Sequence, residues 1–223
     1  MAPDAVLEIH DLAVEFPAAD GGWRRVLRGV SLAVGASERV ALVGESGSGK
    51  SVVALAALGL VAAPGRITDG RVQVGGLDLA TATPDQLRRV RGRSVGLVFQ
   101  EPAGAFNPVY TIGFQIAEAV RSHRAVGRAE AQAIARSLLA TAALDEPSGI
   151  GKAYPHQLSG GQLQRAMIAL ALAGDPGLLI ADEPTTALDL ETQARILTLL
   201  RRLADGGRAL LLISHDLAVV AGL

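Results

Sequence analysis

The sequence has no cysteine, little lysine and few aromatic residues. The absence of cysteine excludes disulfides and thiolate metal sites. Aromatic residues make up 3% of the 223 residues, and of the 21 basic residues only Lys50 and Lys152 are lysines. A lysine at a given position is therefore unusual in this chain, which gives weight to one that falls inside a motif.

Long hydrophobic runs are also missing. The longest nearly uninterrupted run, 52–63, is shorter than the ~20 residues that a membrane-spanning helix needs. The chain does not open with a charged stretch, an apolar core and a cleavage site, so we expect no signal peptide and a cytosolic location. With 49% hydrophobic and 19% charged residues, the composition is typical of one large globular domain, or of one domain with an inserted lobe.

An excess of charge of either sign is absent as well. The net charge of −1 provides no global basic field that would favour nucleic acid. One local run, RRVRGR at 88–93, is strongly basic. It is interpreted as a solvated helix face or turn, with a phosphate or acidic-partner site as the alternative.

The pattern of short apolar runs predicts an α/β fold with a largely parallel sheet. Strands are expected at 6–16, 31–44, 70–76, 94–100, 177–184 and 208–216, of which 40–44 reads as a buried parallel strand. Helices are expected from the glycine-rich loop to about residue 60 and over 188–207. From 101 to 165 only helices are expected, at 114–124 and 128–144, with apolar residues Ile134, Leu138 and Leu139. This segment is predicted to be an inserted helical lobe.

A phosphate-binding loop is the clearest motif. The stretch GESGSGKS at 44–51 fits G-x-x-x-x-G-K-[ST] between a predicted strand and a predicted helix. Glycines let the backbone approach phosphate oxygens, Lys50 would reach the β and γ phosphates, and Ser51 would place its hydroxyl on Mg²⁺. The residues assigned to phosphate binding are Gly44, Glu45, Ser46, Gly47, Ser48, Gly49, Lys50 and Ser51.

Polar residues at predicted strand ends form a second group of candidates. Asp182 and Glu183 follow an apolar strand, where an aspartate can hold Mg²⁺ and a glutamate can polarise water. A polar strand exit is the structural alternative. Gln100 and His215 also stand at predicted strand ends. A bare glutamine here favours a surface position, and a lone histidine is more often structural, although this strand end could also put the His215 imidazole near a γ-phosphate.

A second anion-binding helix start lies at LSGGQ, 158–162. Apolar residues recur in the helical period that follows, which predicts a buried stripe and an exposed helix start at Ser159. The stripe consists of Leu163, Ala166, Met167, Leu170 and Ala171, and Gly174 and Pro176 end the helix. This site has no lysine and needs an anion held elsewhere. Sequence alone leaves open whether that anion is bound by the same chain or by another subunit.

The ordered motifs GESGSGKS, VFQ, LSGGQ, LLIADEP, ALD and ISHD resemble the ATP-binding subunits of ABC transporters. The stretches FQEPAGAFNPVYTIGFQIAEAV and YPHQLSGGQLQRAMIALAL are similar to the dipeptide, oligopeptide and nickel importers of that family. The resemblance implies a P-loop NTPase (RecA-like) fold with a mainly parallel sheet. It adds an N-terminal antiparallel β subdomain and an inserted helical subdomain. The expected division is 1–100 and 166–223 for the core and 101–165 for the helical subdomain, in one C-terminally incomplete domain.

The resemblance also implies roles for individual residues. Glu183 and His215 would be catalytic, and Gln100, the Q-loop residue, would act in catalysis and in Mg²⁺ binding with Ser51 and Asp182. Phe16 would stack on adenine, although a strand core would also accommodate it. The nucleotide of an opposite subunit would meet Ser159, Gly160, Gly161 and Gln162 of the signature motif and Asp189 of the D-loop.

The same resemblance implies that two such domains pack head-to-tail around ATP and Mg²⁺ and hydrolyse the ATP. The partners would be a second ATP-binding subunit, integral membrane permease subunits and, indirectly, a solute-binding protein, at the cytoplasmic face of the cell membrane. Nucleic acid is not expected. Two alternatives are a soluble non-transport ABC-type ATPase acting on nucleic acid or ribosomes, and a binding module that holds ATP without turnover.

Overall fold

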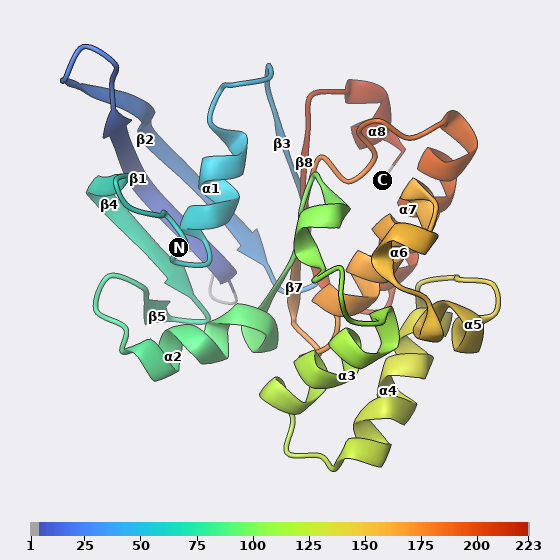
Figure 1. Cartoon of the computed structure of the whole chain (residues 1–223). Helices are drawn as coiled ribbons and strands as arrows, with labels where there is room; N and C mark the ends of the chain where they lie inside the picture. Colours follow the sequence, from blue (N-terminus) through green and yellow to red (C-terminus); the bar gives the residue numbers. More distant parts are fainter. Residues whose placement is uncertain (1–4, 223) are drawn as a thin grey trace.

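The structure, a computed structural model, describes residues 5–222 and contains two four-stranded sheets (Figure 1). The antiparallel sheet has the order β2-β1-β4-β5, and the parallel sheet the order β3-β8-β7-β6. The strands of the first are β1 (Ala5–Pro17), β2 (Trp23–Gly35), β4 (Arg66–Val74) and β5 (Leu77–Asp78). Those of the second are β3 (Arg39–Val43), β6 (Val95–Val98), β7 (Leu178–Asp182) and β8 (Ala209–Ser214). Both sheets of the predicted fold are confirmed.

Eight α-helices surround the sheets within residues 5–222. They are α1 (Lys50–Ala56), α2 (Pro84–Arg89), α3 (Ile112–His123), α4 (Arg128–Thr141), α5 (Pro147–Lys152), α6 (Gly160–Ala171), α7 (Leu190–Asp205) and α8 (Leu217–Ala221). Short irregular turns are η1 (Val90–Ser94), η2 (Pro102–Ala105) and η3 (Pro155–Gln157). None of the helices in the described part of the chain has the length and apolar character needed to cross a membrane.

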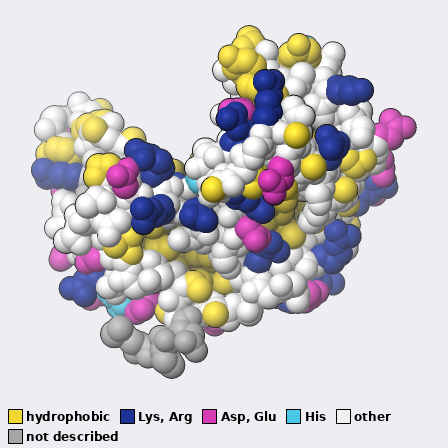
Figure 2. All heavy atoms as spheres, turned by 90° about the horizontal axis from the view of Figure 1, so that it is seen from below, with side chains coloured by type: hydrophobic (Ala, Val, Ile, Leu, Met, Phe, Trp, Pro, Cys, Tyr) yellow, Lys and Arg dark blue, Asp and Glu magenta, His cyan; other side chains and the backbone are white. Residues whose placement is uncertain are grey.

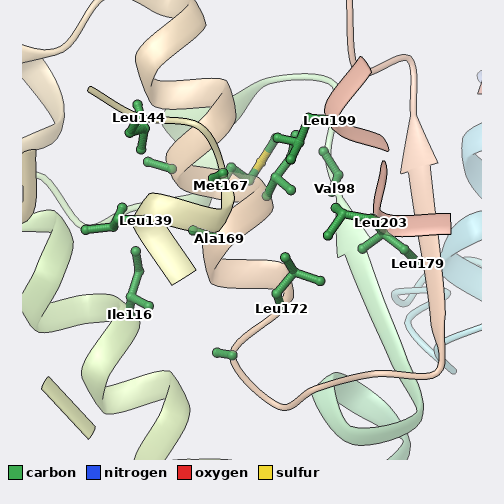
Figure 3. Close-up of a cluster of buried hydrophobic side chains, with 14 of the residues drawn as sticks. Val98, Ile116, Leu139, Leu144, Met167, Ala169, Leu172, Leu179, Leu199 and Leu203 are labelled. Atoms are coloured by element: carbon green, nitrogen blue, oxygen red, sulfur yellow. The ribbon is translucent and has the colours of Figure 1, made fainter. Parts of the chain in front are cut away.

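The parallel sheet separates two layers of helices. Successive side chains of a strand point to opposite faces, so Leu179 and Leu212 pack with α6 and α7, while Ile180 and Leu211 pack with α1. Figure 3 shows the first of these clusters, with Met167 of α6 among the buried side chains. On the other side, α1 lies between the two sheets (Figure 1). The starts of α1 and α6 therefore belong to different layers.

The predicted helical lobe is confirmed as a stretch without strands among the described residues of 101–165, and α3, α4 and α5 pack together there. Helix α4 buries Ala131, Ala135 and Leu139. Two of the three predicted apolar positions, Ile134 and Leu138, are only partly buried against that core. The predicted boundary at 165/166 falls within α6, and the division into subdomains stays a prediction.

The prediction that 40–44 is buried is wrong. Strand β3 is parallel, as predicted, but it forms the edge of its sheet beside β8, and its residues alternate between exposed and partly buried. Val43 is 40% exposed. A run of apolar residues indicates a strand, but only the order of strands in the sheet decides how deeply that strand is buried.

Helix α1 ends earlier than expected, and the basic run at 88–93 is only partly solvated. Gly59 adopts a left-handed φ of 61°, and the Leu60 N–H donates to the Leu55 carbonyl at 2.8 Å, which closes the helix. The Arg91 guanidinium donates to the carbonyls of Leu58 and Gly59 at 2.9 and 2.7 Å. Arg91 is thus a partner for the end of α1, whereas Arg88 pairs with Asp85 at the surface.

Gly49 is constrained both by its backbone and by its neighbours, so Gly49→Ala is expected to destabilise the fold. Its φ is 98°, and a methyl group there would lie 2.8 Å from Leu27 Cδ2. We expect a loss of about 2–4 kcal/mol in the free energy of unfolding, measured by denaturant titration. The matched control is Gly47→Ala, where φ is 79° but the space is open. An equal loss in both variants would rule out the steric contribution of β2.

Candidate active site

The phosphate loop wraps around its own lysine. The loop connects β3 to α1, and Lys50, the first residue of α1, is 7% exposed. Its ammonium donates to the carbonyl oxygens of Gly44 and Glu45 at 2.7 and 2.8 Å. Ser46, Gly47 and Ser48 are exposed at the tip of the loop. The Lys50 ammonium is therefore held at the base of the loop, and residues 46–48 above it are open to solvent.

The parallel register brings the predicted catalytic residues to this loop. Val43 pairs with Ser214, and Asp182 pairs with Ile213, so the carboxyl ends of β3, β8 and β7 lie at one edge of the sheet. Glu183, directly after β7, has a left-handed φ of 47° and donates its N–H to the Ile213 carbonyl at 2.9 Å. This turn directs the glutamate toward its neighbours.

The Glu183 carboxylate has separate surroundings at its two oxygens. Oε1 lies 3.6 Å from the Lys50 ammonium. Oε2 accepts a hydrogen bond from the Thr186 hydroxyl at 3.0 Å and lies 3.1 Å from His215 Nδ1. The His215 side chain is about half exposed, whereas those of Glu183 and Lys50 are 11% and 7% exposed. Three of the predicted residues thus meet at one point.

The pKa values of the adjacent carboxyl groups of Asp182 and Glu183 are shifted in opposite directions. Burial raises the pKa of Glu183, but the hydrogen bonds from His215 and Thr186 and the nearby positive charges outweigh it and hold the pKa below its ordinary value. Burial also raises the pKa of Asp182, and there it prevails, although the Ser51 hydroxyl and Lys50 oppose it. Glu183, whose carboxylate form is favoured by these contacts, is the stronger candidate for the base.

The residues predicted to hold Mg²⁺ lie together. Ser51 and Asp182 line a pocket of about 350 Å³ with Gln100, which follows β6 and is exposed. Asp182 Oδ1 is buried without a hydrogen-bond partner among the described residues. No cluster of three or more His, Cys, Asp or Glu side chains in residues 5–222 could form an all-protein metal cage. An orphaned carboxylate oxygen beside a serine hydroxyl fits Mg²⁺, which binds few protein ligands and completes its shell with water and phosphate.

The position of Phe16 agrees with both a contact with adenine and a place in the core. It lines an open pocket of about 820 Å³ with Gly47, Ser48 and Arg24. It is also partly buried against the core, and a methyl group on Gly65 would lie 2.4 Å from its ring. Its predicted contact with adenine therefore stays a prediction.

The signature segment begins α6 with a complete cap. The Ser159 hydroxyl accepts from the Gln162 N–H at 3.3 Å, and the Gln162 side chain accepts from the Ser159 N–H at 3.0 Å. Ser159 and Gly160 are exposed, as predicted. Leu163, Ala166 and Met167 of the predicted stripe are buried, whereas Leu170 and Ala171 are partly buried. Asp189 in turn caps α7 and is exposed.

Sequence reasoning missed Thr186 and the arginines of β2. Thr186 lies three residues after Glu183, and a hydroxyl at this spacing often closes a turn. The spacing does not show which oxygen accepts the hydrogen bond of that hydroxyl. Arg24, Arg25 and Arg28 line the pocket beside Gly47 and Ser48. They could not be assigned to it because the packing of β2 against the phosphate loop is a tertiary contact.

The hydrogen bond from Thr186 is expected to orient the Glu183 carboxylate for catalysis. Thr186→Val keeps the shape and removes the hydroxyl donor to Oε2. We therefore expect kcat for the ATP hydrolysis that the sequence resemblance implies to fall about 5–20-fold, with KM changed little. Thr186→Ser keeps a hydroxyl and should retain most of the turnover. Steady-state phosphate release measures both variants, and equal rates for the two would show that the hydrogen bond has no role.

Comparison with known proteins agrees with this geometry. The fold and the phosphate loop define the chain as a P-loop NTPase. Its sequence matches the family described as ABC transporter over residues 27–186, well over half of the chain, and the chain belongs to that family.

Individual relatives carry peptide-transport names. The oligopeptide transport ATP-binding protein OppD of Mycobacterium tuberculosis is 46% identical over 218 residues, which is 97% of this chain and 35% of the relative. The dipeptide transport ATP-binding protein DppD of Escherichia coli K12 is 44% identical, over 97% of this chain and 66% of the relative. The chain thus spans about one third to two thirds of the length of these relatives.

A solved structure matches the fold closely. It is the dimeric, post-hydrolysis state of the ATP-binding cassette MJ0796 bound to ADP and Pi, with a TM-score of 0.83 and 29% identity. The match covers 97% of this chain and 90% of that one. The predicted fold class is therefore confirmed.

Proposed function

We propose that the chain is the ATP-binding and ATP-hydrolysing part of an ABC transporter that imports peptides. The observation that carries this proposal is the convergence of Lys50, Glu183 and His215 at the carboxyl edge of the parallel sheet. The names of the relatives, which specify oligopeptide and dipeptide transport, support peptides as the solute. Nickel or a related small solute is the alternative cargo within the same subgroup.

The side chains present account for hydrolysis in separate steps. Lys50 binds the β and γ phosphates and neutralises charge that builds up on them. Glu183 accepts a proton from the attacking water, and the low pKa of this carboxyl keeps it ionised. His215, on the opposite side of that carboxylate from Lys50, supports Glu183 and stabilises charge near the γ-phosphate. Phe16 stacks on the adenine.

Ser51, Asp182 and Gln100 would hold Mg²⁺. The ion would supply positive charge to the phosphate oxygens. Ser51 contributes a hydroxyl, and Asp182 contributes the carboxylate whose Oδ1 has no hydrogen-bond partner within residues 5–222. Gln100 lines the same pocket at the entrance to the helical lobe, where it is placed to relate the state of the site to movement of α3–α5.

A second copy or a paralogue completes the site. The start of α6 lies in the other helix layer from α1, which supports a contact of Ser159 with the nucleotide of a neighbouring subunit rather than with its own. The solved relative is a dimer. Two head-to-tail subunits would place each signature segment opposite a phosphate loop, with ATP favouring the closed pair and hydrolysis releasing it.

The membrane partners are permease subunits, with a solute-binding protein acting through them. The chain would lie at the cytoplasmic face of the membrane as a peripheral subunit. Val109, Tyr110 and Phe114 are apolar, 41–68% exposed, and close to Gln100 in sequence, which makes this part of the lobe a contact region for a permease. Lys and Arg side chains are interspersed with Asp and Glu over the face in Figure 2, rather than gathered as for nucleic acid.

The test is to purify the full-length protein with its permease subunits and reconstitute the complex in proteoliposomes. Peptide and its binding protein should stimulate ATP hydrolysis and cause peptide to accumulate, in amounts that depend on ATP. Stimulation by nickel chelates alone would reassign the cargo. Association with ribosomes or nucleic acid in place of membrane subunits would favour the non-transport alternative, and tight ATP binding without phosphate release would favour the binding module.

A further inference from the structure

Gly161 of the signature segment is close to a residue of α7. A methyl group built on Gly161 would lie 2.4 Å from Thr192 Cγ2, far inside normal contact. A methyl group built on the neighbouring Gly160 would lie 3.7 Å from Leu188 Cδ2, an ordinary van der Waals contact. The glycine at position 161 is therefore explained by packing within the chain, in addition to any approach to phosphate.

Thr192 cannot easily turn away from Gly161. Its backbone N–H donates to Asp189 Oδ1 at 2.9 Å, and its hydroxyl donates to Asp189 Oδ2 at 2.8 Å. The methyl and hydroxyl groups share one Cβ atom, so any rotation that moves Cγ2 also moves Oγ1 away from Asp189. A side-chain rotation that moved the methyl group away from α6 would therefore break the hydroxyl bond to Asp189, although the N–H bond that caps α7 would remain.

We infer that Thr192 is a positioning residue that joins the two segments facing the partner subunit, the signature segment and the D-loop. Its methyl group packs on Gly161, while its hydroxyl and amide hold both oxygens of Asp189. The two segments then reach the opposite nucleotide in one fixed relation. This inference rests on the proposed dimeric function, because only a dimer presents a nucleotide to both segments.

The two ends of Thr192 can be tested separately. Gly161→Ala introduces the clash and is expected to lower kcat for ATP hydrolysis by about 10-fold, with ATP affinity unchanged. Thr192→Ser removes only Cγ2, so alone it loses the packing on Gly161 and should lower kcat by about 3-fold. In the double variant Gly161→Ala/Thr192→Ser the added methyl group takes the place of the missing one, and kcat should return to within about 3-fold of wild type. Thr192→Val keeps the methyl group and removes the hydroxyl, and should lower kcat without changing KM.

The matched control is Thr198→Val on the exposed side of the same helix, where the hydroxyl donates to the Ala194 carbonyl. It should leave kcat, KM and the unfolding temperature unchanged. A double variant as inactive as Gly161→Ala, or a Thr192→Val variant that behaves like Thr198→Val, would overturn the inference.

Failure of the proposed function would look different. In that case the wild type itself would neither hydrolyse ATP nor form an ATP-dependent dimer. If the wild type is inactive, the contact of Thr192 with Gly161 and Asp189 is tested by thermal unfolding and by hydrogen exchange of the α7 amides. Gly161→Ala should loosen the start of α7, and Thr192→Ser should reverse that change; no reversal would reject the link.

Discussion

Glu183→Gln is expected to bind ATP, to accumulate as an ATP-bound dimer, and to hydrolyse ATP at least about 100-fold more slowly than wild type. The amide keeps the size of the side chain but cannot accept the proton of water. It also removes the negative charge 3.6 Å from the Lys50 ammonium, so Lys50 is freed for phosphate and ATP affinity should not fall. Phosphate release and size-exclusion chromatography with ATP measure the two effects.

Glu130→Gln is the matched control for this variant. Glu130 is exposed in the first turn of α4, on the helical lobe and outside the site. The same change of charge there should leave turnover and the dimer equilibrium unaltered. Unchanged turnover in Glu183→Gln would refute the assignment of Glu183 as the base.

Ser159→Arg is expected to abolish dimer closure and turnover while leaving ATP binding to a single chain mostly intact. The arginine replaces an exposed residue at the start of α6 and fills space that the opposite nucleotide needs. Lys50 and the phosphate loop lie in the other helix layer and are not disturbed. In a Glu183→Gln background, the ATP-dependent dimer should be lost when it is measured by analytical ultracentrifugation.

Ser159→Ala separates this steric effect from the loss of the helix cap. Alanine removes the acceptor for the Gln162 N–H and should cost about 1 kcal/mol of stability, yet it leaves room for the partner. A smaller loss of dimer than in Ser159→Arg is expected. If ATP affinity of the single chain collapsed in Ser159→Arg, the signature segment would act on its own nucleotide instead.

Much of the site followed from the sequence because parallel strands place their carboxyl ends at one edge. Asp182, Glu183 and His215 lie at or directly after the ends of such strands, and Lys50 follows the loop that begins where β3 ends. Recognising the strands and the loop motif is enough to bring these residues together. The hydrogen-bond partners of these residues could not be predicted from the sequence. The hydrogen bond from Thr186 to Glu183 depends on the left-handed turn at Glu183, and the neighbouring residues in the sequence do not indicate that turn.

Burial and long-range packing could not be predicted in the same way. The apolar run of β3 reads like that of β7, yet β3 lies at the edge of the sheet and β7 in its interior. Arg91 looked solvated because its partners, the carbonyls ending α1, are more than thirty residues earlier. Short elements with mixed composition, such as β5 and α2, carry too few apolar positions to show a period.

The separation of α1 and α6 into two layers has a genetic consequence. In the proposed head-to-tail dimer of two copies, each chain would contribute its phosphate loop to one composite site and its signature segment to the other. A dimer of one chain damaged at Lys50 and one damaged at Ser159 can contain one fully intact site and one doubly damaged site. Two inactive alleles would then restore partial activity when expressed together, whereas one allele carrying both changes would not.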